Sequence, residues 1–210
     1  PQLAREMKEE HGFDIEYGEI PAIRLALTES EERFLKERLS EIQSKGHAAR
    51  WVGESEVKAL WPDIGPRIRG GLLFPGAQVE PYKYVLALAQ AAEAKGASFK
   101  QGQAVGLRSK GSRVTAVATS TRGVEADVVV LAMGPWSGQG ASWAGKKIPI
   151  VVQREQCLRV EVPKRLPPYR LSTGDVAIIP KVNGTVVIGR AFLHDMVDYD
   201  DRPTDEARNR

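Results

Sequence analysis

The pattern of apolar and polar positions predicts two amphipathic helices in the first half of the chain. Thr28 and Glu31 have the spacing of a capping box, which predicts a helix that ends at Gly46. The apolar face of this helix has four residues at helical spacing, namely Phe34, Leu35, Leu39 and Ile42. A second helix is predicted from Pro81 to Gly96, because proline suits a first helical turn and glycine a helix end.

Strand patterns dominate from residue 97 onward. One short strand is predicted before this point, at 71–74, and the others are predicted at 97–101, 104–108, 113–119, 124–132, within 148–162, at 176–179 and at 185–189. Turn residues at 110–112 and at Asn183-Gly184 predict that two pairs of these strands form hairpins. The order of elements is therefore that of a mixed α and β protein.

The run Val-Val-Val-Leu-Ala at 128–132 is the most informative of these strands. Continuous apolar runs of this length are typical of parallel strands buried on both faces, and ligands usually bind beyond the carboxyl ends of such strands. Gly134 follows the run and has no Cβ, so a backbone there can approach a flat or anionic group. The alternative is an ordinary core strand followed by a tight turn, and composition alone does not separate the two.

Composition and charge exclude several classes of protein. The chain of 210 residues is 42% hydrophobic, enough for a core, and its 30 basic residues are nearly balanced by 27 acidic ones spread along the sequence. We therefore expect no nucleic-acid partner. One cysteine and three scattered histidines predict neither disulfides nor a metal site. No apolar run approaches the roughly eighteen residues of a membrane span, and we expect a cytoplasmic protein.

A set of short motifs occurs in a fixed order along the chain. They are LLFPGAQVEP at 72–81, AKG at 94–96, Val105, ADVVVLAMGPWS at 126–137, IPI at 148–150 with Arg154 and Gln156, and IIP at 178–180 with Gly184 and VIG at 187–189. In order and spacing this set resembles the central part of the FAD-dependent amino-acid and amine oxidoreductases, a family that includes glycine oxidase, sarcosine oxidase and D-amino-acid dehydrogenase.

The resemblance implies an α+β / α/β fold with two domains. A mixed-sheet substrate domain, with helices on one side, would accompany an incomplete piece of a Rossmann-like FAD-binding domain, made of a β-meander and one parallel strand. Residues 1–80 and 148–199 would form the two parts of the substrate domain. Residues 81–147 would form the partial FAD-binding domain, with helix, meander and buried strand, and 200–210 a truncated tail.

The resemblance also implies where FAD would bind. In this family the backbone of the residue that matches Val105 contacts the adenine end of FAD, and a second segment lies close to the cofactor. The matching residues of that segment are Ala132, Met133, Gly134 and Trp136. No Gly-x-Gly-x-x-Gly turn is present to hold the pyrophosphate, and we interpret Gly138-Gln139-Gly140 as turn chemistry because its spacing is wrong. We therefore expect an internal fragment that binds FAD weakly or not at all.

Two departures from the family pattern concern the substrate. Ala177 stands where a tyrosine is common, and Glu155 stands where a glycine is usual, so a larger amine than a simple amino acid becomes plausible. Arg154 and Arg190 are further candidates for the substrate pocket, although an arginine beside acidic neighbours is more often part of a surface ion pair. No side chain is required as an acid or base, so no catalytic residue is named.

The predicted function is that of a fragment of an FAD-dependent oxidoreductase. The parent enzyme would oxidise a C–N bond of an amino acid or secondary amine by hydride transfer to flavin, and the isolated chain would be inactive. One alternative is a non-catalytic binding or interaction module that retains the substrate-domain fold, and another is a fragment of a glycerol-3-phosphate dehydrogenase-like flavoenzyme. Exposed strand edges predict self-association of the isolated chain.

Overall fold

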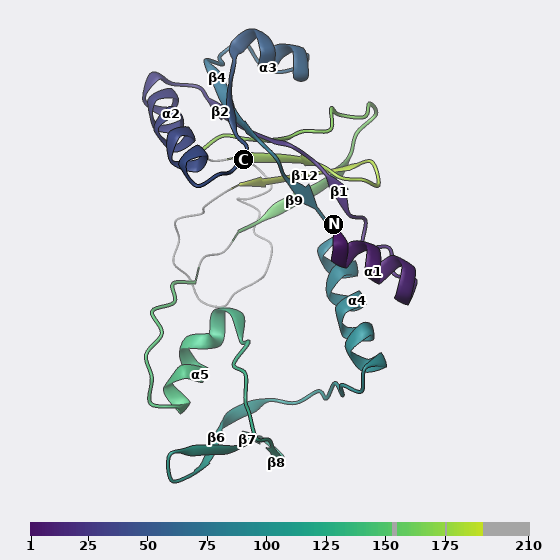
Figure 1. Cartoon of the computed structure of the whole chain (residues 1–210), viewed down its shortest axis with the longest axis vertical. Helices are drawn as coiled ribbons and strands as arrows, with labels where there is room; N and C mark the ends of the chain where they lie inside the picture. Colours follow the sequence, from purple (N-terminus) through teal and green to yellow (C-terminus); the bar gives the residue numbers. More distant parts are fainter. Residues whose placement is uncertain (153–154, 175, 191–210) are drawn as a thin grey trace. The chain divides into compact units, whose positions relative to one another are not determined.

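The computed structural model of the chain describes residues 1–152, 155–174 and 176–190, and it divides into two compact units (Figure 1). The first, here called the sheet unit, contains Pro1–Gly96 and the described residues from Glu155 onward. The second, here called the meander unit, contains the described residues of Ala97–Arg154. The mixed α and β architecture that the sequence predicts is confirmed.

The sheet unit is built on a seven-stranded mixed sheet (Figure 1). Its strands lie in the order β3 (Arg50–Gly53), β4 (Gly70–Phe74), β2 (Ala22–Ala26), β10 (Arg170–Ser172), β11 (Val176–Pro180), β12 (Thr185–Arg190) and β9 (Cys157–Glu161). Only the pair of β2 and β10 is parallel. This pair joins the two parts of the unit, which lie far apart in the sequence. A separate two-stranded sheet pairs β1 (Gly18–Glu19) with β5 (Ala77–Gln78).

The predicted hairpin at Asn183-Gly184 is confirmed, because β11 and β12 pair antiparallel around it. Gly184 has a φ of 88°, which a glycine adopts without the steric cost that a Cβ brings. The side chain of Asn183 closes the turn by accepting a hydrogen bond from the backbone N–H of Thr185.

The core of the sheet unit lies on one face of the sheet. Ile23 and Leu25 point to this face of β2, whereas Ala22, Arg24 and Ala26 point to the other face, where only Arg24 is exposed. Ile23 and Leu25 belong to a buried cluster with Val52, Val57, Trp61, Ile68 and Leu171. Burial of each aliphatic side chain of this size contributes about 1.5–3 kcal/mol, so this cluster is a main source of stability.

Helix α2 (Glu29–Ser44) contacts the opposite face of the sheet at β2, β4 and β3, and α3 (Glu54–Leu60) contacts β3 and β4. The predicted capping box of α2 is confirmed, because the Glu31 N–H donates to Thr28 Oγ1 and the Thr28 N–H donates to Glu31 Oε2. The predicted apolar face is partly wrong. Leu35 is buried, but Phe34 is 49% exposed, because its ring lies beside the guanidinium of Arg24 rather than in the core.

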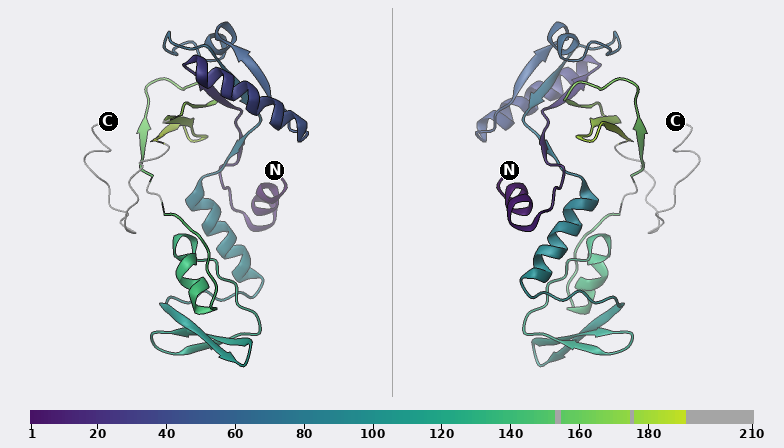
Figure 2. Two further views of the ribbon diagram at one scale, coloured as in Figure 1. Left: turned by 90° about the vertical axis from the view of Figure 1, so that its left-hand side faces the viewer. Right: turned by 90° about the vertical axis from the view of Figure 1, so that its right-hand side faces the viewer.

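A second, smaller cluster joins the helices α1 (Gln2–His11) and α4 (Pro81–Ala94), which lie side by side in Figure 2. Met7, Ile15 and Ala87 are buried there. Helix α4 agrees with the prediction that begins at Pro81. Among the described residues no helix is both long enough and apolar enough to cross a membrane.

The meander unit contains a three-stranded antiparallel sheet of β6 (Ala104–Lys110), β7 (Arg113–Thr119) and β8 (Gly123–Glu125). The predicted hairpin at 110–112 is confirmed, and Gly111 has a φ of 61° in its turn. A 3₁₀ turn, η1 (Gly134–Trp136), leads into α5 (Ser137–Trp143). The interpretation of Gly138-Gln139-Gly140 as turn chemistry is wrong, because these residues lie within α5.

Three strand predictions are wrong in whole or in part. Residues 97–101 form no strand, and the pattern at 148–162 yields a strand only at β9. Residues 128–132 form no strand either, and Val128 and Val130 are 79% and 81% exposed. The physical reason is that a buried parallel strand needs a neighbour for its backbone N–H and C=O groups, and no described segment pairs with these residues.

Candidate functional site

One row of residues on a face of the sheet carries small side chains, and no described helix contacts the strands on which it lies. Residues directly opposite each other on paired strands point to the same face, and the register aligns Ser172, Ala177, Gly189 and Cys157 across β10, β11, β12 and β9. We call these four residues the small-residue row. Toward β2 the row continues through Arg24 to Leu72 and Trp51. Helix α2 covers only that end, and no described helix contacts β9 to β12.

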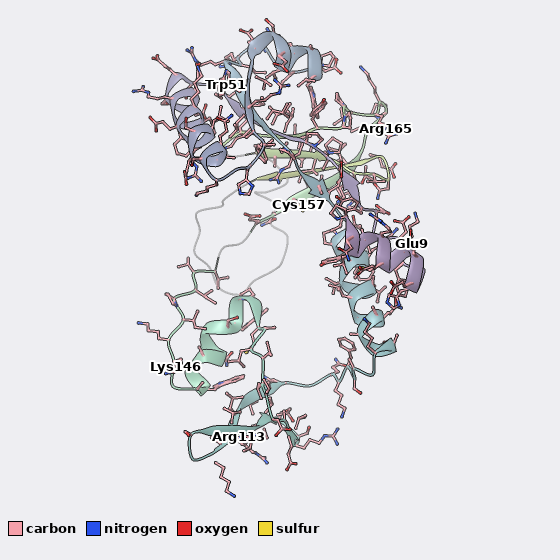
Figure 3. The ribbon with its side chains drawn as sticks, viewed as in Figure 1. Glu9, Trp51, Arg113, Lys146, Cys157 and Arg165 are labelled. Carbon is pink, nitrogen blue, oxygen red and sulfur yellow. The ribbon has the colours of Figure 1, made fainter. Side chains whose placement is uncertain are left out.

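Ala177 lies in the middle of the small-residue row, opposite Ser172 on one side and Gly189 on the other. It is partly buried, and neither neighbour carries a large side chain. At the end of the row Cys157 is an exposed free thiol on β9, labelled in Figure 3. The side chains of the small-residue row therefore project only a short distance from the sheet. The role of Ala177 in a substrate pocket stays a prediction.

Arg24 lies next to the small-residue row. It was not among the site residues predicted from the sequence. It lies in the centre of β2 between buried residues, yet it is exposed, and its guanidinium lies 5.9 Å from the ring centroid of Phe34. Among the described residues the guanidinium of Arg24 makes no hydrogen bond and no ion pair. A charged residue inside the otherwise apolar segment Ala-Ile-Arg-Leu-Ala is the signal that would have singled it out.

The carboxylate of Glu31 lies in the field of Arg24. Burial of Glu31 raises the pKa of its carboxyl, but hydrogen bonds from the Leu27 and Thr28 N–H groups, the Thr28 hydroxyl and the positive charge of Arg24 together lower that pKa below its usual value. Glu31 is therefore ionised at neutral pH as part of the helix cap. The hydrogen bonds that Glu31 accepts come from groups of the helix cap. The N–H groups of the Arg24 guanidinium therefore remain available to another acceptor.

A charged cluster lies where the sheet meets the start of α4. Arg159 on β9 donates to both carboxylate oxygens of Glu80, at 3.1 and 2.9 Å, and Lys181 Nζ lies 3.8 Å from the same carboxylate. Lys181 also donates to the backbone oxygen of Val79 at 2.8 Å. The hydrogen bond from Arg159 is the main cause of the lowered pKa of Glu80, which burial opposes and the charges of Arg159, Lys181 and Lys83 reinforce.

The contacts described so far do not test the prediction that two arginines line the substrate pocket. Arg154 lies outside the described residues. Arg190 ends β12 opposite Val176, and its side chain lies outside the described part of the chain. Both assignments stay predictions.

Val105 lies at an irregularity in the meander. The register of β6 on β7 shifts between Ala104 and Gly106, so Val105 has no cross-strand partner, and it is 51% exposed. A bulge of this kind leaves backbone groups outside the ladder, where they are available to a ligand. This geometry suits a backbone contact with a ligand, and the role of Val105 stays a prediction.

Ala132 to Trp136 form the turn that leads into α5. Gly134 has a φ of 53°, and a Cβ added there would have no atom within 4 Å, so this backbone is open on its Cα side. The Ser137 hydroxyl donates to the Gly134 oxygen at 2.7 Å and closes the turn. Met133 packs against Gly140 of α5 at a distance that leaves no room for a Cβ on that glycine. Gly134, Ala132 and Trp136 are exposed, whereas the Met133 side chain is partly covered.

Among the described residues the histidine, cysteine, aspartate and glutamate side chains form no group that could hold a metal ion. Two candidate sites therefore remain. One is the small-residue row with Arg24 in the sheet unit, and the other is the backbone at Val105 and Gly134 in the meander unit.

Comparison with known proteins identifies a family to which the chain is similar. The family model for FAD dependent oxidoreductases (DAO) matches residues 1–210. The hydrogen cyanide synthase subunit HcnC of Pseudomonas aeruginosa is 28% identical over 194 residues, which cover 90% of this chain and 46% of HcnC. Glycine oxidase of Geobacillus kaustophilus is also 28% identical over 194 residues, 90% of this chain and 51% of that enzyme.

Among solved structures, glycine oxidase from Bacillus cereus matches with a TM-score of 0.79 and 26% identity, covering 94% of this chain and 56% of that one. The chain thus spans about half the length of the curated relatives it matches.

Proposed function

The chain belongs to the FAD dependent oxidoreductase family, and from this premise we propose that it is part of an enzyme that oxidises a C–N bond of an amino acid or secondary amine. The mixed-sheet substrate domain and the partial FAD-binding domain of that family are its fold. The observation that carries the proposal is the uncovered half-face of the sheet, where the small-residue row lies beside the unpaired guanidinium of Arg24. Relatives that are named as amino-acid oxidases support the substrate class.

We propose that FAD is held by the meander unit. The backbone of Val105 lies outside the ladder, and Gly134 offers a turn with open space at its Cα, which together fit a nucleotide that approaches the backbone closely. Ala132, Met133 and Trp136 are proposed to complete this wall. When bound, FAD supplies the hydride acceptor for the carbon beside the substrate nitrogen.

The residues of this chain would bind and orient the substrate. Arg24 would receive the carboxylate of an amino acid, since a guanidinium with free donors binds a carboxylate through two hydrogen bonds. Ala177 and Gly189 would provide room above the sheet for a substrate larger than glycine. Arg154 and Arg190 are proposed to line the same pocket. None of these groups is required to transfer a proton.

We further propose that the isolated chain is inactive, retains FAD weakly at best and associates with itself through exposed edges in the cytoplasm. The absence of the Gly-x-Gly-x-x-Gly fingerprint from these residues supports weak binding, because the helix start that follows such a turn normally holds the pyrophosphate. The outer edge of β9 and the exposed Val128 and Val130 support self-association.

The experiment that tests this function uses the whole protein that contains this chain. Anaerobic addition of small amino acids and secondary amines should bleach the visible absorbance of its flavin, and an imine-derived carbonyl product should accumulate. A protein that binds FAD but is reduced by none of these amines would contradict the proposed reaction. A protein without FAD would instead favour the alternative of a binding module that retains the substrate-domain fold.

A further inference from the structure

Phe34 of α2 is a large apolar residue that stays half exposed, although the next residue, Leu35, is buried. The guanidinium carbon of Arg24 lies over the ring of Phe34, 5.9 Å from the ring centroid. This distance falls within the roughly 6 Å at which an aromatic face attracts a cation. The side chain of Phe34 therefore contacts the charge of Arg24 and does not join the core.

The contact with Phe34 leaves the hydrogen-bond donors of Arg24 unused. An aromatic ring attracts a cation through its electron-rich face and offers no strong acceptor atom. Within the part of the chain that the structure describes, the guanidinium forms neither a hydrogen bond nor an ion pair. Glu31 is close enough to feel the charge of Arg24, but its Oε2 accepts hydrogen bonds from the helix cap. Arg24 is thus held by a contact that does not neutralise it.

A second cation of α2 shows how this arrangement differs from an ordinary surface contact. Lys36 also lies over an aromatic ring, 5.0 Å from the centroid of Trp51, but its Nζ donates to Glu32 Oε1 at 2.7 Å. The carboxylate of Glu32 neutralises the charge of Lys36 and occupies one of its donors. Arg24 has the aromatic contact without the carboxylate, so its charge and its donors remain available to an anion.

We propose that Phe34 is a positioning residue, which holds the guanidinium of Arg24 ready for the carboxylate of the substrate. The inference rests on the proposed function, in which Arg24 binds that carboxylate beside the small-residue row. Strand β2 fixes the backbone of Arg24 but leaves its long side chain free to rotate. Contact with the ring restricts this rotation before the substrate binds, so less conformational entropy is lost on binding. An amine without a carboxylate gains nothing from this order, and Phe34 therefore favours substrates that carry one.

Nitrogen-15 relaxation of the arginine Nε–H groups tests whether Phe34 holds Arg24, and this measurement needs no oxidation reaction. In the 210-residue chain Arg24 should be more ordered than Arg33, an exposed arginine of α2. Phe34→Leu should lower the order of Arg24 to that of Arg33, whereas Phe34→Tyr keeps an aromatic ring and should preserve it. Lys36→Met removes the other cation–aromatic contact of α2 and should leave Arg24 unchanged. Equal order of Arg24 in the wild type and in Phe34→Leu would overturn the inference.

Kinetics of the whole protein that contains this chain test the consequence for the substrate. Phe34→Leu should raise the KM for a small amino acid about two- to fivefold, as expected for one exposed cation–aromatic contact, and should leave kcat unchanged. Phe34→Tyr should keep the wild-type KM, and an amine without a carboxylate should have the same KM in all three proteins.

The outcomes separate this inference from the proposed function. If Arg24→Gln raises the KM for the amino acid and Phe34→Leu does not, the positioning role of Phe34 is wrong and the proposed function stands. An unchanged KM in Arg24→Gln would overturn both the carboxylate site and the role of Phe34. A flavin that no amine reduces would contradict the proposed function, and the relaxation of Arg24 would then decide the role of Phe34 by itself.

Discussion

Arg159 donates two hydrogen bonds to the carboxylate of Glu80, although 79 positions separate these residues in the sequence. This ion pair connects the edge strand β9 to the residue that precedes α4. Lys181, which directly follows β11, contributes a third charge. The ion pair is therefore a link between the two parts of the sheet unit. Lys181 and Glu80 are mostly covered, with side-chain exposures of 8% and 14%, whereas Arg159 is 42% exposed.

Glu80→Gln should destabilise the sheet unit by about 1–2 kcal/mol at neutral pH, because hydrogen bonds to a charged acceptor exceed those to a neutral amide. The pKa of Glu80 is lowered in the folded state, so this contribution is present above the usual glutamate value of 4.5 and is lost as the pH falls through the lower, folded value. Urea unfolding of wild type and variant should therefore give curves that converge in acid. Glu93→Gln, at an exposed position of α4, serves as the control. A difference that persists unchanged in acid would refute the role of the ionised carboxylate.

Thr28→Ala should destabilise the chain by about 0.5–2 kcal/mol, because the hydroxyl of Thr28 accepts the hydrogen bond of the Glu31 N–H at the start of α2. Thermal unfolding followed by circular dichroism measures the effect. Thr121→Ala changes the same side chain in an exposed turn of the meander unit and should cost less. Equal costs in the two variants would show that the cap contributes nothing specific.

Gly140→Ala and Gly138→Ala make a matched pair within α5. A Cβ at Gly140 would collide with the sulfur of Met133, whereas a Cβ at Gly138 would meet only the Ile148 oxygen, at 3.7 Å. We expect Gly140→Ala to destabilise the meander unit by about 1–3 kcal/mol through overpacking. Gly138→Ala should instead be neutral or stabilising by up to about 1 kcal/mol, through helix propensity. Hydrogen exchange of the α5 amides distinguishes the two, and faster exchange in both variants would contradict the packing of Met133 on Gly140.

The isolated chain should leave gel filtration without stoichiometric flavin, because no helix start in these residues follows a pyrophosphate-binding turn. Any weak binding should decrease further in Gly134→Val, since a side chain there would meet the left-handed φ of 53° and fill the open space at the Cα. Flavin fluorescence titration measures both. Gly145→Val, at a glycine with a φ of 64° outside the proposed wall, controls for the backbone strain alone. Yellow protein that keeps its flavin through the column would disprove weak binding.

Local signals explain which parts of the fold could be predicted. The Asn183-Gly184 hairpin and the Thr28 cap depend on residues within a few positions of each other, and both are confirmed. The buried strand at 128–132 depends on neighbours elsewhere in the chain, and an apolar run alone does not supply them. The small-residue row could not be predicted for the same reason, because only the pairing of β2 with β10 brings Arg24 next to Ser172.

Arg24→Gln tests whether this arginine orients the substrate in the whole protein. We expect the KM for a small amino acid to rise about tenfold or more, because the glutamine amide cannot replace the charged, bidentate contact of a guanidinium with a carboxylate. For a matched amine that lacks a carboxylate, wild type and variant should have similar KM values. Arg33→Gln, at an exposed position of α2, controls for the lost charge alone. The comparison separates orientation from stability, since a variant that merely unfolds would lose activity toward both substrates. If the KM for both substrates stayed unchanged, the carboxylate would bind elsewhere, and the uncovered half-face would lose its proposed anchor.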